Sequence, residues 1–161
     1  MKPKVAIIIT NYNYGKYIMA AVDSILNQTY RGEIRVYVVD DGSSDNSWDL
    51  LSEVTDPVES LAHTDRPYYS GPMDIRQRDT IYVYKINNSG ASTGRNVALH
   101  EAWEWADIFG ILDSDDAYYP EKVEKLVEKL MEYPEVGVAY ADYKNVNPAF
   151  GKIEFKTSYC A

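Results

Sequence analysis

Short apolar runs alternate along the chain with segments of helical periodicity. The first run, residues 5–9, is continuous and rich in β-branched side chains, which is typical of a strand buried on both faces of a parallel sheet. In the segment that follows, apolar residues recur at the spacing of one helix face: Ile18, Ala21, Val22, Ile25 and Leu26. This alternation favours an α/β fold with a mainly parallel open sheet and helices on both faces.

The same criteria predict the other elements. Further strands are expected at 34–39, 81–86, 108–112 and 136–140, with a short edge strand at 151–156. Helices are expected at 47–54, after a polar loop at 87–94, and from Pro120 onward, because a proline suits the first position of a helix. No domain linker is visible, so residues 1–161 are predicted to form a single domain.

Residues 55–79 are the least regular part of the sequence. They contain Pro57, Pro67, Gly71 and Pro72 and little periodicity. They are interpreted as a long excursion before the third strand. Such a loop is either a functional lid or a decorated surface segment, and the sequence does not decide between the two.

The formal net charge is −9, which excludes a nucleic-acid backbone as the expected partner because phosphates require a basic surface. An anionic ligand would need a metal ion or well-placed arginines. The single cysteine, Cys160, favours a reducing compartment. The apolar run at 5–9 is too short to span a membrane, so the expected location is cytoplasmic, with attachment to the inner face of a membrane left open.

Polar clusters follow the predicted strands. They stand at residues 10–13, 40–41, 87–88 and 113–116. In an open parallel sheet, ligands bind beyond the carboxyl ends of the strands, near a switch in strand order. The four clusters therefore predict one shared site.

The acidic cluster Asp113-Ser114-Asp115-Asp116 places three carboxylates in four residues. Their mutual repulsion favours a bound cation. Hard ions such as Mn²⁺ or Mg²⁺ take one or two protein carboxylates together with phosphate oxygens. Alternatively, the cluster is a turn ahead of the next helix.

Asp41 and Arg95 each have two interpretations. Asp41 can accept a hydrogen bond from a ligand N–H, or it can cap the following helix together with Asp40, whereas Asp45 is expected to be a cap. Arg95, expected in the first turn of its helix, suits a phosphate or a base but can also form a solvated salt bridge.

Several motifs occur in an order that resembles the family 2 glycosyltransferases. They are residues 5–13 (VAIIITNYN), 24–29 (SILNQT), 38–45 (VVDDGSSD), 88–90, Arg95-Asn96 and 112–116 (LDSDD). The resemblance covers nearly all of residues 3–143. It implies the GT-A fold, a Rossmann-like fold of nucleotide-diphospho-sugar transferases, and transfer of a sugar with inversion.

Carried over residue by residue, the resemblance implies the following nucleotide contacts. Thr10 and Tyr12 would lie beside the base, and Asp41 would bind the uracil edge of a UDP-sugar. Arg95 would face the base or the diphosphate.

The resemblance also implies the metal ligands. Asp113 and Asp115 would form the Asp-x-Asp motif that contacts ribose and metal, and Asp116 would share the metal or the donor sugar. Asp115 and then Asp116 are the favoured ligands of Mn²⁺ or Mg²⁺.

No residue is assigned as the general base. The family's base and acceptor-binding half normally follow the fifth strand, so the chain is expected to stop before the acceptor-binding part. The acceptor, whether glycan, lipid or protein, is not identified. A binding module or inactive fragment with the same site is the main alternative. A nucleotidyltransferase is disfavoured because the first strand lacks a following glycine-rich basic loop, and a receiver domain because its acidic pair would follow the first strand.

Overall fold

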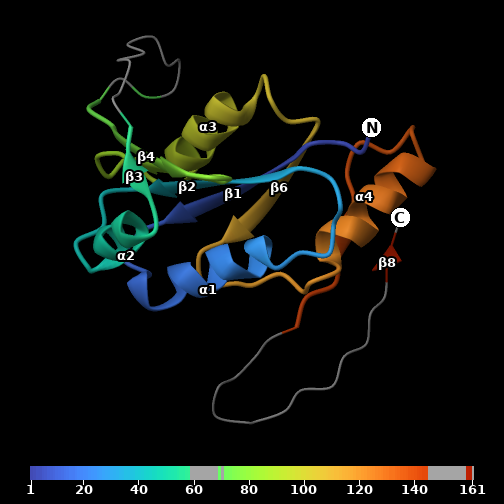
Figure 1. The fold of residues 1–161 in the computed structure, drawn as a ribbon, viewed down its shortest axis with the longest axis horizontal. Helices are drawn as coiled ribbons and strands as arrows, with labels where there is room; N and C mark the ends of the chain where they lie inside the picture. The colour runs from blue at the N-terminus through green and yellow to red at the C-terminus, as the bar shows by residue number, and fades with distance from the viewer. Residues whose placement is uncertain (59–68, 70, 145–158, 161) are drawn as a thin grey trace.

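The structure, a computed structural model, describes residues 1–58, 69, 71–144 and 159–160. A six-stranded sheet has the order β3-β4-β5-β2-β1-β6 (Figure 1). The strands are β1 (Val5–Asn11), β2 (Ile34–Asp40), β3 (Asp56–Pro57), β4 (Asp74–Arg78), β5 (Ile81–Lys85) and β6 (Ile108–Asp113). The neighbours β5, β2, β1 and β6 run parallel, which confirms the mainly parallel sheet.

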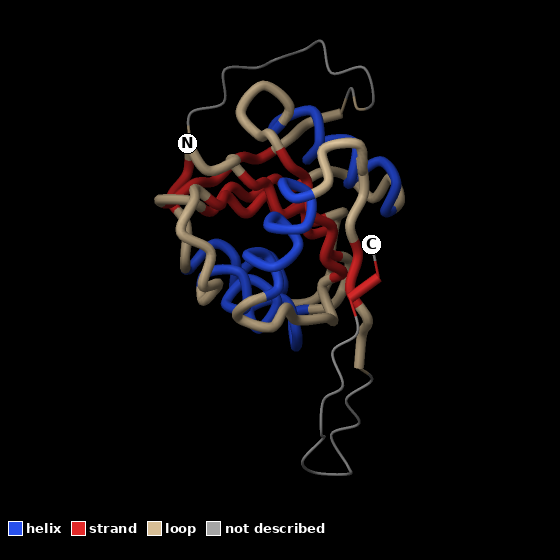
Figure 2. Tube along the Cα trace, turned by 90° about the vertical axis from the view of Figure 1, so that its right-hand side faces the viewer, coloured by secondary structure: helices blue, strands red, loops and turns tan. Residues whose placement is uncertain are grey.

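Helices cover both faces of this sheet. They are α1 (Gly15–Leu26), α2 (Ser47–Glu53), α3 (Ala91–Ala102) and α4 (Lys122–Glu132). α3 lies on one face, and α1, α2 and α4 lie on the other (Figure 1). Figure 2, turned by 90°, shows helices on both sides of the sheet. Among the helices of the described residues, none has the length and apolar character needed to cross a bilayer.

The first strand shows why its sequence is continuously apolar. Ile7 and Ile9 pack in one buried cluster with Ile18 of α1, whereas Ile8 packs in the other with Ala98 of α3. Successive side chains of a strand point to opposite faces, so a strand covered on both sides needs apolar residues at every position. Each fully buried Ile or Val contributes about 1.5–3 kcal/mol, which fixes the sheet firmly between its helices.

The excursion at 55–79 is not wholly a loop, which corrects the prediction. β4 pairs antiparallel with β5, with Ile75 opposite Tyr84, and the short β3 pairs antiparallel with β4. These two strands extend the sheet beyond β5. Only Ile75 in β4 is a large apolar residue, which is why apolar periodicity did not reveal the strand.

The region after β6 differs from the prediction in two places. α4 begins at Lys122 rather than at Pro120. The strand predicted at 136–140 is also wrong for most of its length, because only β7 (Tyr140–Ala141) is a strand, and it pairs with β8 (Tyr159–Cys160) apart from the main sheet. The edge strand predicted at 151–156 lies outside the described residues.

Candidate functional site

The carboxyl ends of the parallel strands bring the predicted polar clusters together. In the strand register, Asn11 at the end of β1 lies opposite Asp40 at the end of β2. On the other side of β1, Thr10 lies opposite Asp113 at the end of β6. From β1 the chain adds β2 and then β5 on one side and later places β6 on the other side of β1, so the strand order switches here, where ligands bind in open parallel sheets.

The loops after β1 and β2 are joined by a buried carboxylate. Asp40 is fully buried, and its Oδ1 accepts hydrogen bonds from Asn11 Nδ2 at 3.0 Å and from Ser43 Oγ. Asn11 Nδ2 also lies 3.2 Å from Ser43 Oγ. These bonds compensate the burial of the charge, so Asp40 is a structural residue of the site rather than a helix cap.

Asn13 provides a second link between the same two loops. Its Oδ1 accepts hydrogen bonds from the backbone N–H of Ser44 at 2.7 Å and of Asp45 at 3.3 Å. Its φ of 60° lies in the left-handed region, which asparagine adopts more readily than most residues. The neighbouring Tyr12, predicted to lie beside a base, is 47% exposed and is therefore available to a ligand.

Asp45 ties together the starts of two helices. Its Oδ2 accepts the N–H of Gly15, the first residue of α1, at 2.8 Å, and its Oδ1 accepts the N–H of Ser47, the first residue of α2, at 3.0 Å. The predicted capping role is therefore extended to both helices. Desolvation raises the pKa of Asp45, but the hydrogen bonds from Ser47 and Gly15 outweigh it and hold the pKa below 3.8.

Because the folded pKa of Asp45 is lowered, its stabilisation should be complete above its ordinary pKa and lost as the pH falls through the lowered value. We expect Asp45→Asn to lower the free energy of unfolding by about 1 kcal/mol at pH 7, and by less in acid. Urea unfolding at pH 7 and pH 3 measures both differences. The control is Asp23→Asn in α1, also an exposed aspartate. A loss from Asp45→Asn that grows in acid would contradict the role of the carboxylate.

The carboxylate of Asp41 contacts the loop before α3. It is 3% exposed, and its two oxygens accept the backbone N–H of Ser89 at 2.7 Å and of Gly90 at 2.8 Å. Asp41 therefore does not cap α2, and that interpretation is wrong. A carboxylate has about four acceptor sites, so a ligand N–H can still bind beside these two partners.

α3 begins earlier than predicted, at Ala91, and this changes the position of two residues. Gly94 lies inside the helix rather than in the preceding loop, and Arg95 lies beyond the first turn. A Cβ atom on Gly94 would be 3.1 Å from Thr10 Cγ2, so the glycine lets α3 approach the end of β1 closely.

Arg95 forms an ion pair with Asp113, at 3.1 Å between Nη2 and Oδ1. The side chains are 35% and 59% exposed. The salt bridge that the sequence left as an alternative is therefore present, and it joins α3 to the end of β6. Exposed pairs of this kind contribute about 0–1 kcal/mol, so a diphosphate can compete for the guanidinium at little cost.

Asp115 and Asp116 follow β6 as exposed side chains. Solvent and the pairing of Asp113 with Arg95 relieve the repulsion that the sequence suggested, so charge crowding does not by itself require a cation. Within the described residues, no three His, Cys, Asp or Glu side chains gather to hold a metal. Two exposed carboxylates still fit a hard ion that takes its other ligands from phosphate and water.

Tyr118 lies next to this acidic turn. Its OH donates to the carbonyl oxygen of Ile111 at 2.7 Å. Burial, and then the charges of Asp113 and Asp116, raise the pKa of Tyr118 to about 12. The phenol therefore stays protonated at neutral pH and does not supply a general base.

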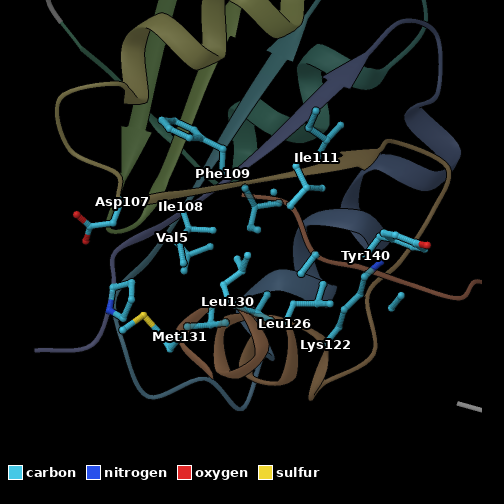
Figure 3. Close-up of a pocket in the computed structure, with 18 of the residues that line it drawn as sticks. Val5, Asp107, Ile108, Phe109, Ile111, Lys122, Leu126, Leu130, Met131 and Tyr140 are labelled. Carbon is cyan, nitrogen blue, oxygen red and sulfur yellow. The ribbon is translucent and has the colours of Figure 1, made fainter. Parts of the chain in front are cut away.

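A groove of about 750 Å³ lies away from these strand ends, between β6, α4 and residues 136–141 (Figure 3). Its walls are mostly apolar and include Ile108, Leu126 and Leu130. Burial lowers the pKa of Lys122, the cation at its edge, although Asp116 opposes the shift. Since a diphosphate needs several cationic or N–H groups, this groove is a poor candidate for a nucleotide-sugar site.

The sequence predicts the loops at the strand ends but not the hydrogen bonds that join these loops to one another. Asn11 and Asn13 were recognised only as members of a polar cluster, and the backbone N–H groups of Ser89 and Gly90 have no sequence signature of their own. The positive φ of Gly90, 88°, marks the turn into α3. The glycine was a visible signal of that turn, but not of its contact with Asp41.

Comparison with known proteins gives a consistent result. Residues 6–156 match the family described as glycosyl transferase family 2. The glycosyltransferase GlyA of Streptococcus pneumoniae is 30% identical over 152 residues, which are 94% of this chain and 18% of GlyA.

Two solved structures share the fold. TarS residues 1–349 of S. aureus in complex with UDP-GlcNAc aligns with a TM-score of 0.64 and 23% identity, over 94% of this chain and 37% of that one. The mannosyltransferase PcManGT of Pyrobaculum calidifontis, in complex with GDP-Man and Mn²⁺, aligns with a TM-score of 0.60 and 22% identity, over 81% and 33%. The chain spans 36% and 18% of the length of the first two curated relatives.

Proposed function

The chain belongs to glycosyl transferase family 2, and from this premise we propose that it moves a sugar from a UDP-sugar to an acceptor hydroxyl with inversion. The observation that carries the proposal is the convergence of Thr10, Asp41, Arg95 and Asp113 at the carboxyl ends of β1, β2 and β6. Family membership makes the protein a transferase, which favours turnover over a pure binding module.

The nucleotide would lie across the end of β1. Thr10 and the exposed ring of Tyr12 would flank the base, and Asp41 would accept the imide N–H of uracil with an acceptor site that Ser89 and Gly90 leave free. Solved structures with this fold hold both UDP-GlcNAc and GDP-Man, so the fold alone does not select the base. The proposed preference for uridine therefore rests on Asp41.

The diphosphate would lie between α3 and the end of β6. Arg95 would turn from Asp113 toward the diphosphate, and Asp113 would then be free to contact ribose. Asp115, with Asp116, would hold Mn²⁺ or Mg²⁺. When bound, such an ion neutralises the diphosphate and stabilises the charge that develops as it leaves.

In the proposed reaction, the acceptor oxygen attacks the anomeric carbon from the side opposite the diphosphate. The bond from this carbon to the diphosphate oxygen breaks, and its electron pair remains on the diphosphate. The hydroxyl proton passes to an Asp or Glu base that we do not assign to any residue of this chain. The acceptor is a glycan, a lipid or a protein.

We also propose a cytoplasmic location, free or at the inner face of a membrane. The single thiol, Cys160, is consistent with this reducing environment.

Calorimetry with UDP, with and without Mn²⁺, tests the donor site. We expect UDP to bind and Mn²⁺ to tighten binding at least about tenfold, a difference of about 1.4 kcal/mol. Absence of binding heat under both conditions would overturn the proposal. Incubation with UDP-sugars then separates an enzyme from a binding module, because only the enzyme releases UDP.

A further inference from the structure

The turn that leads into α3 has its backbone bound by a distant carboxylate. Both oxygens of Asp41 are engaged, one with Ser89 N–H and one with Gly90 N–H. The bonds measure 2.7 and 2.8 Å, and the carboxylate is almost completely buried. Charge-assisted bonds of this length are stronger than neutral ones, and burial shields them from water.

A glycine allows the two loops to approach each other this closely. Gly42 has a φ of 72°, and a Cβ atom placed on it would lie 2.8 Å from the backbone nitrogen of Asn88. The residue after Asp41 therefore packs directly against the residue before Ser89. The contact leaves the Ser89–Gly90 turn little freedom to move relative to β2.

The turn determines where the first residues of α3 lie. The start of α3 has no side-chain cap and no acidic residue in its first turn, so its free N–H groups carry the positive end of the helix dipole. One turn later, Arg95 reaches Asp113. The start of α3 and its guanidinium therefore depend on the position of the turn.

We propose that Asp41 is a positioning residue for the donor site. Its carboxylate holds the Ser89–Gly90 turn and so fixes the start of α3 and Arg95 beside the end of β6. The inference rests on the proposed function, because it gives the fixed helix terminus a diphosphate to bind. It adds to the base contact proposed for Asp41 and concerns a different part of the nucleotide.

Two variants separate positioning from a direct base contact. Asp41→Asn keeps the shape of the side chain but turns an N–H group toward one of the two backbone donors. Ser89→Pro removes one backbone donor and leaves the Asp41 carboxylate intact. Ser89→Ala keeps that donor and removes only the hydroxyl, and Asp56→Asn, in an exposed ion pair with Arg78, is the control for an Asp-to-Asn change elsewhere.

The first measurement is amide hydrogen exchange in the ligand-free protein. In Asp41→Asn, whichever of the Ser89 and Gly90 amides faces the new N–H group should exchange about tenfold faster or more than in the parent, because a lost bond of this kind is worth about that factor. Exchange in Asp56→Asn should match the parent. Unchanged exchange at Ser89 and Gly90 in Asp41→Asn would overturn the proposal.

The second measurement is the dissociation constant for UDP with Mn²⁺, recorded together with the thermal midpoint. Asp41→Asn and Ser89→Pro should each raise the constant about tenfold or more, Ser89→Ala should raise it much less, and the double variant should bind no more weakly than the worse single one. If Ser89→Pro binds as tightly as the parent, or if the losses add in full, Asp41 does not act through the turn.

The two proposals can fail separately. If the folded parent binds no UDP, the proposed donor site is wrong, while exchange at Ser89 and Gly90 still shows whether Asp41 holds the turn. If Ser89→Pro does not fold, the exchange and binding of Asp41→Asn decide, together with a comparison of UDP and CDP. A loss for both nucleotides supports positioning, and any additional loss for UDP measures the base contact. A loss confined to UDP overturns it, because cytosine lacks the imide N–H.

Discussion

Replacing Asp115 with alanine should abolish the Mn²⁺-dependent part of UDP binding and leave the free energy of unfolding within about 0.5 kcal/mol of the parent. Asp115 is exposed at the end of β6, so its removal leaves no buried group without a partner. Calorimetry with UDP should give the same dissociation constant with and without Mn²⁺ in this variant. Urea unfolding measures its stability.

Glu135→Ala is the matched control for Asp115→Ala. It removes one exposed carboxylate after α4 and should preserve the effect of Mn²⁺ on UDP binding. If Asp115→Ala responds to Mn²⁺ as the parent does, Asp115 is not a metal ligand. Asp116→Ala would then be the next variant, since Asp116 is the second proposed ligand.

Replacing Asp40 with alanine, unlike replacing Asp115, should destabilise the fold. We expect a loss of about 2 to 5 kcal/mol in the free energy of unfolding. Asp40 is fully buried, and the change would remove the acceptor of the Ser43 hydroxyl and one of the two acceptors of Asn11 Nδ2. Urea unfolding followed by circular dichroism measures the loss. UDP binding should weaken as well, because the loops after β1 and β2 would separate.

Asp40→Asn is the matched variant for this second prediction. The amide oxygen can still accept from Asn11 and Ser43, so we expect a loss of about 1 kcal/mol, well below that of alanine. Equal losses in both variants would mean that Asp40 contributes through its charge or its second oxygen, which Ser43 N–H approaches at 3.3 Å, and not through acceptance at Oδ1. A change below about 0.5 kcal/mol for alanine would contradict the structural role altogether.

Asp40 and Asp115 show which parts of the site the sequence could predict. Both follow strands predicted from apolar runs, and the rule that ligands bind at strand ends placed both at the same edge of the sheet. Their burial could not be read from the sequence. The burial of each carboxylate depends on what surrounds it in the fold. Asp40 lies against Asn11 of the neighbouring strand, whereas Asp115 faces solvent.

The fold was predictable where burial on both faces leaves a continuous apolar run. β1, β2, β5 and β6 were found within two residues at either end for this reason. β4 was missed because Asp74–Arg78 is largely polar, and its antiparallel pairing with β5 leaves no local signal. The predicted strand at 136–140 shows the converse, since an apolar run becomes a strand only where a partner strand lies beside it.

The sequence places the start of α3 too late, because a glycine in a polar stretch is more typical of a loop than of a helix. Gly94 lies inside the helix, where it lets Thr10 approach, and this requirement comes from tertiary packing. The pairing of Arg95 with Asp113 depends on the same packing. The sequence can therefore name the residues of the site, but the distances between them follow only from how the helices pack on the sheet.

The bonds that hold the loops together join residues far apart along the chain. Asn11 and Asp40 are 29 positions apart, and Asp41 and Gly90 are 49 apart. During synthesis, the bond between Asn11 and Asp40 can form once Asp40 has left the ribosome, but the bond between Asp41 and Gly90 must wait until Gly90 has emerged. The donor site would therefore form late in folding. A donor nucleotide present in the cell would bind, and so stabilise, only chains in which the sheet is complete.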